Sequence, residues 1–256
     1  MNPLVGRLNQ RGGGSLMFQA GVFPYTNKAI ENFGNIYENA SKSLDCLLTW
    51  ITQENYLYKY NLLPHSIKRI NFRVIEISFR AKNSWLSALK DRKVLIVSPF
   101  AELMEQQYKR KDDIYASTNV SLPDFDLKTV TAVNSNGYSW QTCGFNSWFE
   151  ALYMMKSKIA DIDFDIALLG CGAYAFPLAS FCKELGKQAI TTCGSTELLF
   201  GLYGTRWKNL PEINSAWIRP GGKYMPEGGK KLKTELIGKN YEIQFYYSDL
   251  QHRELH

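Results

Sequence analysis

The chain has 256 residues, of which 45% are hydrophobic and 21% are charged, and its formal net charge is +6. This length suits one large domain or two small ones with a packed core, and the composition excludes a disordered chain. The mild positive charge favours anionic ligands, although a solvated basic face explains it equally well. No apolar run reaches the length of about 18 residues that a membrane helix needs, and the first residues lack the apolar core of a signal peptide.

The five cysteines are odd in number and scattered, at positions 46, 143, 171, 182 and 193. They lack the spacing of a metal site, and an odd set does not form a complete disulfide framework. Reduced thiols in a cytoplasmic protein are therefore expected.

The first clear element in chain order is a long amphipathic helix that begins near Thr26, after a glycine-rich and irregular stretch over residues 1–24. Its apolar side chains recur at steps of three and four residues, at Ile30, Phe33, Tyr37, Ala40, Leu44 and Leu47. A strand is predicted at residues 45–51, an aromatic loop at 56–60, and a second strand at 72–79, where apolar and polar residues alternate.

A buried strand is predicted at residues 93–97, KVLIV, because Lys93 is followed by a short continuous apolar run. A short helix is predicted before this run, from Ser84 to Leu89, and a longer one after it, over residues 101–115. Ser147 and Glu150 form a capping-box pattern that predicts the start of a further helix.

The central stretch, residues 165–204, predicts a β-α-β unit. A strand at 166–169 leads to a glycine turn at 170–173, then to a helix that ends at Gly186, and then to a strand at 188–192. The fold class is therefore α/β, a mainly parallel sheet with helices on both faces. One domain is expected over residues 1–256, with an irregular part rich in glycine, proline and lysine from about residue 208.

The glycine turn matches the G-x-G-x-x-A pattern of a dinucleotide fingerprint through Gly170, Gly172 and Ala175. Such a turn presents free N–H groups and a helix dipole to a phosphate. A merely tight turn between strand and helix is the alternative. The match to an NAD site stops at the end of the second strand, where Thr192 and Cys193 stand in place of the acidic residue that holds a ribose. Hydride transfer is therefore not expected.

The same stretch resembles a known family. Residues 164–174, FDIALLGCGAY, resemble a block found among bacterial enzymes of polysaccharide biosynthesis, the O-antigen and capsule clusters. Further similar segments lie in the same order and spacing over most of the chain to Pro220, at residues 20–24, 94–100, 107–110, 177–179, 186–190, 199–201 and 206–207. The family is that of the GT-D glycosyltransferases.

The resemblance implies a Rossmann-like α/β fold and transfer of a sugar from a nucleotide sugar to a glycan or lipid-linked acceptor. It implies a cytoplasmic enzyme, with a peripheral contact at the inner face of the membrane. The chain departs from the family at residues 6–14, where relatives carry an acidic motif linked to metal and donor binding, and where this chain has no carboxylate. Three interpretations stay open: a divalent metal such as Mn²⁺ or Mg²⁺ is not used, another carboxylate serves, or activity is lost.

Sugar transfer requires a base for the acceptor hydroxyl and donors that neutralise the leaving diphosphate. The three histidines, at positions 65, 252 and 256, lie beside no strand-end turn, so a carboxylate base is expected. Glu197 and Glu102 both follow predicted strand ends and are the candidate catalytic residues. The alternative for each is an ordinary glutamate in the first turn of a helix, where the dipole stabilises it.

The candidate residues for binding the nucleotide sugar combine turn amides with basic side chains, because arginine bonds two phosphate oxygens together. They are Arg7, Ser98, Arg110, Gly170, Gly172, Ala173, Tyr174, Gly194, Ser195 and Arg206. The Tyr174 ring stacks on a base or sugar in this interpretation, and simple packing is its alternative. The rival function is a non-catalytic nucleotide- or glycan-binding protein. No nucleic-acid partner is expected, because the lysines of the tail alternate with glycine rather than with aromatic residues.

Overall fold

The structure, a computed structural model, describes residues 16–17, 20–50, 54–64, 66–76, 78–81, 84–137 and 139–220. Arg7, the stretch 6–14 and all three histidines lie outside these ranges. Within them, no helix is both long enough and apolar enough to cross a membrane.

The centre of the molecule is a four-stranded sheet in which every neighbouring pair is parallel. Its strands are β3 (Lys93–Ser98), β4 (Asp126–Thr131), β5 (Ile166–Leu169) and β6 (Gln188–Thr191), in the spatial order β4-β3-β5-β6. β3 and β5 are the inner strands, and almost all of their side chains are buried. A parallel sheet buried on both faces needs such continuous apolar strands, which is why their short apolar runs could be read from the sequence.

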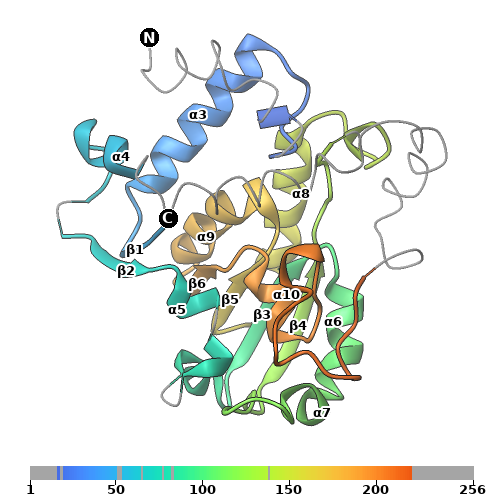
Figure 1. Ribbon diagram of the computed structural model, residues 1–256. Coiled ribbons are helices and arrows are strands. Elements are labelled where there is room, and N and C mark those ends of the chain that lie inside the picture. Colours follow the sequence, from blue (N-terminus) through green and yellow to red (C-terminus); the bar gives the residue numbers. More distant parts are fainter. Residues whose placement is uncertain are drawn as a thin grey trace.

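Helices cover both faces of this sheet (Figure 1). One face carries Leu95 and Val97 of β3 and packs against α3 (Asn27–Ser41), α8 (Trp148–Ala160) and α9 (Ala175–Glu184). The other carries Val94 and Ile96 and packs against α6 (Ala101–Tyr108), α7 (Lys111–Tyr115) and α10 (Ser195–Leu199). Successive side chains of a strand point to opposite faces, so one strand supplies both cores. The predicted α/β architecture is confirmed at this level.

The predicted helix starts are confirmed by their caps. The Thr26 hydroxyl accepts a hydrogen bond from the amide of Ala29 at 3.2 Å. The Ser147 hydroxyl accepts one from the amide of Glu150 at 3.1 Å, and the Glu150 carboxylate in turn accepts one from the amide of Asn146. These bonds satisfy N–H groups that a helix leaves unpaired at its start.

A second, smaller sheet lies beside the first, to the left in Figure 1, and consists of β1 (Cys46–Thr49) and β2 (Lys68–Asn71) in parallel. The short helix α4 (Asn55–Lys59) lies in sequence between these strands, where a loop was expected. The predicted strand at 72–79 is wrong, because the chain leaves β2 at Asn71. The Asn71 side chain accepts a hydrogen bond from the amide of Arg73 at 2.9 Å, and this cap starts α5 (Arg73–Glu76).

The remaining differences from the predictions are local. The helix expected over 101–115 is two helices, α6 and α7, and β4 was not predicted at all. Leu44 and Leu47 follow the end of α3 rather than continuing it. Three short 3₁₀ turns matter below: η3 (Trp85–Leu89), η5 (Gly172–Tyr174) and η6 (Thr205–Trp207).

Candidate functional site

The strand order singles out the region outside the carboxyl ends of β3 and β5, the topological crevice, as the candidate site. From β3 the chain moves outward to β4, and it then returns to the other side of β3 to form β5 and β6. In open α/β sheets, ligands bind outside the carboxyl ends of the strands at the point where this direction reverses. Here that point lies between β3, which ends at Ser98, and β5, which leads into the glycine turn after Leu169.

The first turn, residues 170–174, presents unpaired backbone amides at this edge. Cys171 has φ −126° and ψ 36°, and Gly172 has φ +60°. Cys171 lies outside the right-handed helical region and Gly172 lies in the left-handed one, so these residues form a tight turn, and successive N–H groups of such turns are suited to binding an anion. Within the described part of the chain, the N–H groups of Cys171, Gly172 and Ala173 make no hydrogen bond. Gly172 is exposed, and a Cβ added there meets nothing within 4 Å.

Contacts with side chains of other elements fix the position of this turn. The Tyr37 hydroxyl of α3 donates to the carbonyl of Ala173 at 2.7 Å, and burial raises the pKa of that hydroxyl. The Tyr174 ring is 2% exposed and stacks on Trp148 with centroids 4.9 Å apart. Its hydroxyl lies 2.9 Å from that of Ser135, which donates to the carbonyl of Gly21. The Tyr174 ring is therefore packed inside the protein, where no base or sugar reaches it.

The second turn, residues 192–195, packs directly against the first. A Cβ on Gly170 would lie 2.4 Å from the Thr196 hydroxyl oxygen and 3.0 Å from the carbonyl oxygen of Cys193. Gly194 is covered by the Trp207 ring, which an added Cβ would approach to 2.5 Å. Both glycines are thus required by packing, whereas Gly172 alone of the three faces open space. Cys193, at φ +48°, shares the left-handed conformation of Gly172.

Glu197 lies on α10, directly after the second turn. Burial raises the pKa of its carboxyl to about 7. Within the described residues this carboxylate has neither a hydrogen bond nor an ion pair. Ser195, on the same helix, is 2% exposed, and its hydroxyl likewise finds no partner among the described residues. A carboxyl group with a pKa near neutrality, at the edge of a crevice, has the properties that a general base needs.

Glu102 and Ser98 lie at the carboxyl end of β3, on the other side of the crevice. Glu102 is exposed in the first turn of α6. Ser98 is fully buried, and its hydroxyl accepts a hydrogen bond from the amide of Phe100 at 3.1 Å. Ser98 therefore stabilises the turn after β3 and presents no hydroxyl to a ligand, whereas Glu102 faces solvent.

Arg206 is the basic residue that the structure brings to this edge. Its guanidinium forms an ion pair with Glu76 and lies 5.4 Å from the ring centre of Trp50 and 5.2 Å from that of Trp207. It lies close enough to Cys193 to oppose the rise that burial causes in the pKa of that thiol. A guanidinium between two indole rings combines cation–π contacts with hydrogen-bond donors that stay available to an anion.

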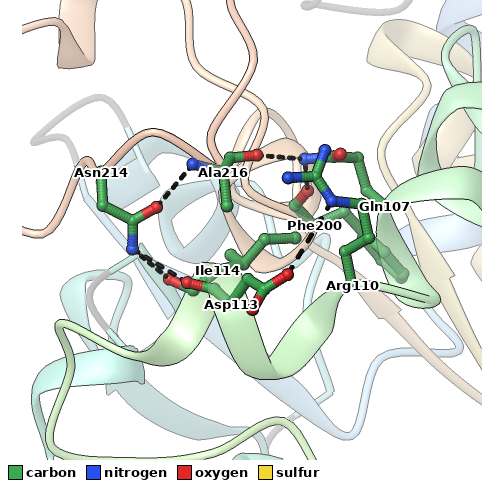
Figure 2. A network of polar contacts seen from close by, with 7 residues as sticks. All are labelled: Gln107, Arg110, Asp113, Ile114, Phe200, Asn214 and Ala216. Carbon is green, nitrogen blue, oxygen red and sulfur yellow. Dashed lines mark hydrogen bonds and ion pairs between the residues drawn. The ribbon is translucent and has the colours of Figure 1, made fainter.

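Arg110 is not brought to the crevice. It lies between the end of α6 and the start of α7, and its guanidinium is 4.0 Å from the Asp113 carboxylate (Figure 2). Because α6 starts at the carboxyl end of β3 and runs back along the sheet, its last residues approach the opposite edge, where Tyr108 donates to the carbonyl of Phe125 just before β4.

That opposite edge carries a depression of about 460 Å³, formed by two loops that precede β3 and β4. Its lining is mainly polar and consists of Ser84, Leu86, Ser87, Lys90, Thr118, Asn119, Val120, Ser121 and Pro123. Lys90 is the one charged residue of this lining. The depression therefore provides fewer groups that bind a phosphate than the turn amides and Arg206 do.

The described residues contain no group of three histidine, cysteine or carboxylate side chains that fits a divalent metal. All five cysteines are free thiols. The sequence did not reveal that Tyr37, Ser135 and Trp207 support the two turns, because these contacts join distant parts of the chain. Comparison with protein-family models, with curated proteins and with solved structures gives no match to this chain.

Proposed function

We propose that the protein is a nucleotide-sugar-dependent glycosyltransferase of the GT-D type, with its donor bound at the carboxyl edge of the sheet. The observation that carries the proposal is the set of unpaired amides of residues 171–173 at the point where the strand order reverses, with Gly172 exposed and its neighbours Cys171 and Ala173 buried. A pyrophosphate is the part of a nucleotide sugar that such a turn binds.

The neighbouring side chains supply the rest of the chemistry. In the transfer step, the acceptor hydroxyl oxygen attacks the anomeric carbon, the bond from that carbon to the phosphate oxygen breaks, and the hydroxyl proton passes to a base. Glu197 is the base in this proposal, because its pKa of about 7 lets it take a proton near neutral pH. Arg206 and the amides of residues 171–173 neutralise the charge that grows on the leaving diphosphate.

Calorimetric titration of the full chain with UDP, GDP and inorganic pyrophosphate tests donor binding. Gly172→Ala should weaken diphosphate binding by at least roughly tenfold, about 1.4 kcal/mol, because a methyl group is added beside the turn amides. Gly186→Ala is the matched control: Gly186 has φ +74° and open space around its Cβ, yet it lies at the end of α9, away from the crevice. Both variants carry a similar backbone strain.

Equal affinities in wild type and Gly172→Ala, or no affinity for any of the three probes, would remove the proposal. A crystal structure with the nucleotide in the depression beside Lys90 would also overturn it. Loss of binding in both glycine variants would indicate general strain instead of a blocked site.

The rival is a non-catalytic nucleotide- or glycan-binding protein, favoured by the absence of a carboxylate from residues 6–14. A panel of UDP- and GDP-sugars separates the two. If wild type slowly releases the nucleoside diphosphate from a donor, and the rate falls at least about tenfold in Glu197→Gln with unchanged diphosphate affinity, the protein is an enzyme. Binding without any release or transfer supports the rival.

A further inference from the structure

The small sheet exposes apolar side chains to solvent. Trp50, which directly follows β1, is 45% exposed, Ile70 of β2 is 42% exposed, and Val74 of α5 is 50% exposed. Among the described residues, only three other large apolar side chains are exposed to a similar or greater degree, Tyr25, Tyr153 and Leu185, and they lie on other elements. Exposed apolar side chains gathered on one small unit indicate a binding surface.

Trp50 and Ile70 share one face of this sheet. In the register of β1 and β2, Leu48 pairs with Ile70 and Thr49 with Asn71, so the next pair is Trp50 with Phe72. The Trp50 and Phe72 rings stack with centroids 5.1 Å apart. Both rings directly follow the strand ends, and the amide of Phe72 still donates to the carbonyl of Thr49 at 2.9 Å, so the pairing continues for one residue and places Ile70 near the exposed Trp50 and the buried Phe72.

The surrounding charge is mainly positive, although α5 ends at Glu76, which pairs with Arg206, and the Glu54 carboxylate accepts a hydrogen bond from the amide of Trp50 at 2.7 Å. Residues 55–75 contain four basic residues and no aspartate or glutamate. All four are exposed, and within the described ranges none forms an ion pair: Lys59, Lys68, Arg69 and Arg73. The guanidinium of Arg69 lies over the Tyr58 ring, 4.8 Å from its centre. Within the described residues, no carboxylate neutralises these four positive charges.

We propose that β1, β2 and α5 form a docking surface for an anionic lipid membrane. Trp50, Ile70 and Val74 enter the interface between headgroups and acyl chains, and the four basic residues contact the lipid phosphates. Indole rings favour this interface, and lysine and arginine strengthen binding to anionic lipid. Single-stranded nucleic acid also takes basic and aromatic surfaces, but aliphatic side chains such as Ile70 and Val74 do not stack on bases, which favours lipid.

The docking surface adjoins the candidate site. Arg206 contacts Trp50 and forms an ion pair with Glu76 of α5. A membrane bound there would lie next to the crevice, where a lipid-linked acceptor would meet the donor. This orientation agrees with the proposed glycosyl transfer, whereas the docking itself is independent of it and is measured without nucleotide.

The test is sedimentation of the full chain with vesicles of phosphatidylcholine alone or mixed with phosphatidylglycerol. We expect binding to the anionic vesicles that weakens as salt is raised, and little binding to phosphatidylcholine alone. The double variant Lys68→Gln with Arg69→Gln should lower the partition coefficient by more than roughly tenfold. Its matched control is Lys109→Gln with Lys158→Gln, two exposed lysines on other elements without ion pairs in the described ranges.

The apolar contribution is tested separately. Ile70→Ser and Trp50→Ser should weaken vesicle binding, and Tyr153→Ser, which removes a 76% exposed aromatic ring from α8, should not. Circular dichroism shows whether each variant folds. If Trp50→Ser does not fold, the vesicle binding of Ile70→Ser alone tests the apolar contribution. Equal binding to both vesicle types, or equal losses in the control variants, would overturn the proposal. Oligonucleotide binding that Lys68→Gln with Arg69→Gln abolishes, with vesicles ignored, would replace the membrane by nucleic acid.

Discussion

Glu197 is the single residue whose chemistry is most altered by the fold. Its carboxyl has an ordinary pKa of 4.5 and a pKa of about 7 in the folded protein, because burial disfavours the charged form and no described group compensates. Glu197 is half-buried, and carboxyl groups with perturbed pKa values gather at functional sites. From this pKa shift we predict how the free energy of unfolding depends on pH.

Glu197 should make the protein less stable as the pH rises from about 4.5 to about 7. In that range the unfolded chain has released this proton and the folded protein still binds it, so raising the pH favours unfolding, and the effect is complete above pH 7. Each unit of pKa difference is about 1.36 kcal/mol, so the rise from 4.5 to about 7 corresponds to a contribution on the order of 3 kcal/mol. Urea unfolding of wild type and Glu197→Gln at pH 5, 6, 7 and 8 measures it as the difference between the two proteins.

At pH 8 we expect Glu197→Gln to be the more stable protein, and at pH 5 the two should be alike. Glu102→Gln provides the control: Glu102 is exposed, so the stability difference between this variant and wild type should not change with pH. A constant difference between wild type and Glu197→Gln across these pH values would show that the carboxyl is not buried as described.

At the scale of elements, the contact between β5 and α10 depends on Gly170. The Thr196 side chain occupies the place that a Cβ would take, with its Cβ 2.7 Å from that position. The Cβ of Thr196 is bonded directly to the backbone, and the nearby carbonyl oxygen of Cys193 belongs to it. Neither atom can therefore rotate away from an added methyl group. Gly172, two residues later, has open space and is constrained only by its left-handed φ.

Gly170→Ala should therefore destabilise the fold by about 2–3 kcal/mol, through overpacking between the strand end and the helix. Gly172→Ala should cost only about 1 kcal/mol, the penalty of a left-handed alanine. Chemical denaturation of the two variants gives both values. Equal losses would mean that β5 and α10 move apart easily, and that the two turns are not in firm contact.

The elements that could be predicted from the sequence are those whose signal is local. The unit from β5 to β6 was readable because its apolar strand, its glycine turn and its helix period follow one another within a short stretch. β4 was missed because it is an edge strand, with its side chains mostly half-buried or exposed. The strand expected at 72–79 was wrong because the side chain of Asn71 caps a helix, an effect that alternation does not reveal.

In the candidate site, too, features with a local sequence signal could be predicted, and those that depend on distant residues could not. Gly172, Glu102 and Glu197 could be placed at one edge because parallel strands end on the same side of a sheet. Packing of the Tyr174 ring was an alternative that the sequence left open, but its partners Trp148 and Ser135, which are distant in sequence, could not be predicted. Arg110 was misplaced because the length and direction of α6 carry it to the far edge.

On the scale of the whole molecule, stability is unevenly distributed. Val94–Val97 of β3 are fully buried between two layers of helices, whereas every side chain of β2 is exposed and those of β1 are half-buried. Hydrogen exchange should show this contrast, with amides of β3 and β5 exchanging at least about a hundredfold more slowly than those of β1 and β2. Similar protection in both sheets would instead make them one cooperative unit.

The segment after α10 closes the described part of the molecule. The buried amide of Gln107 donates to the carbonyls of Phe200 and Ala216, the second lying 109 residues further along (Figure 2). During translation, α6 leaves the ribosome long before these acceptors exist. A nascent chain stopped before Ala216 would offer the buried Gln107 amide only the Phe200 carbonyl, so full pairing of this amide waits until synthesis has passed Ala216.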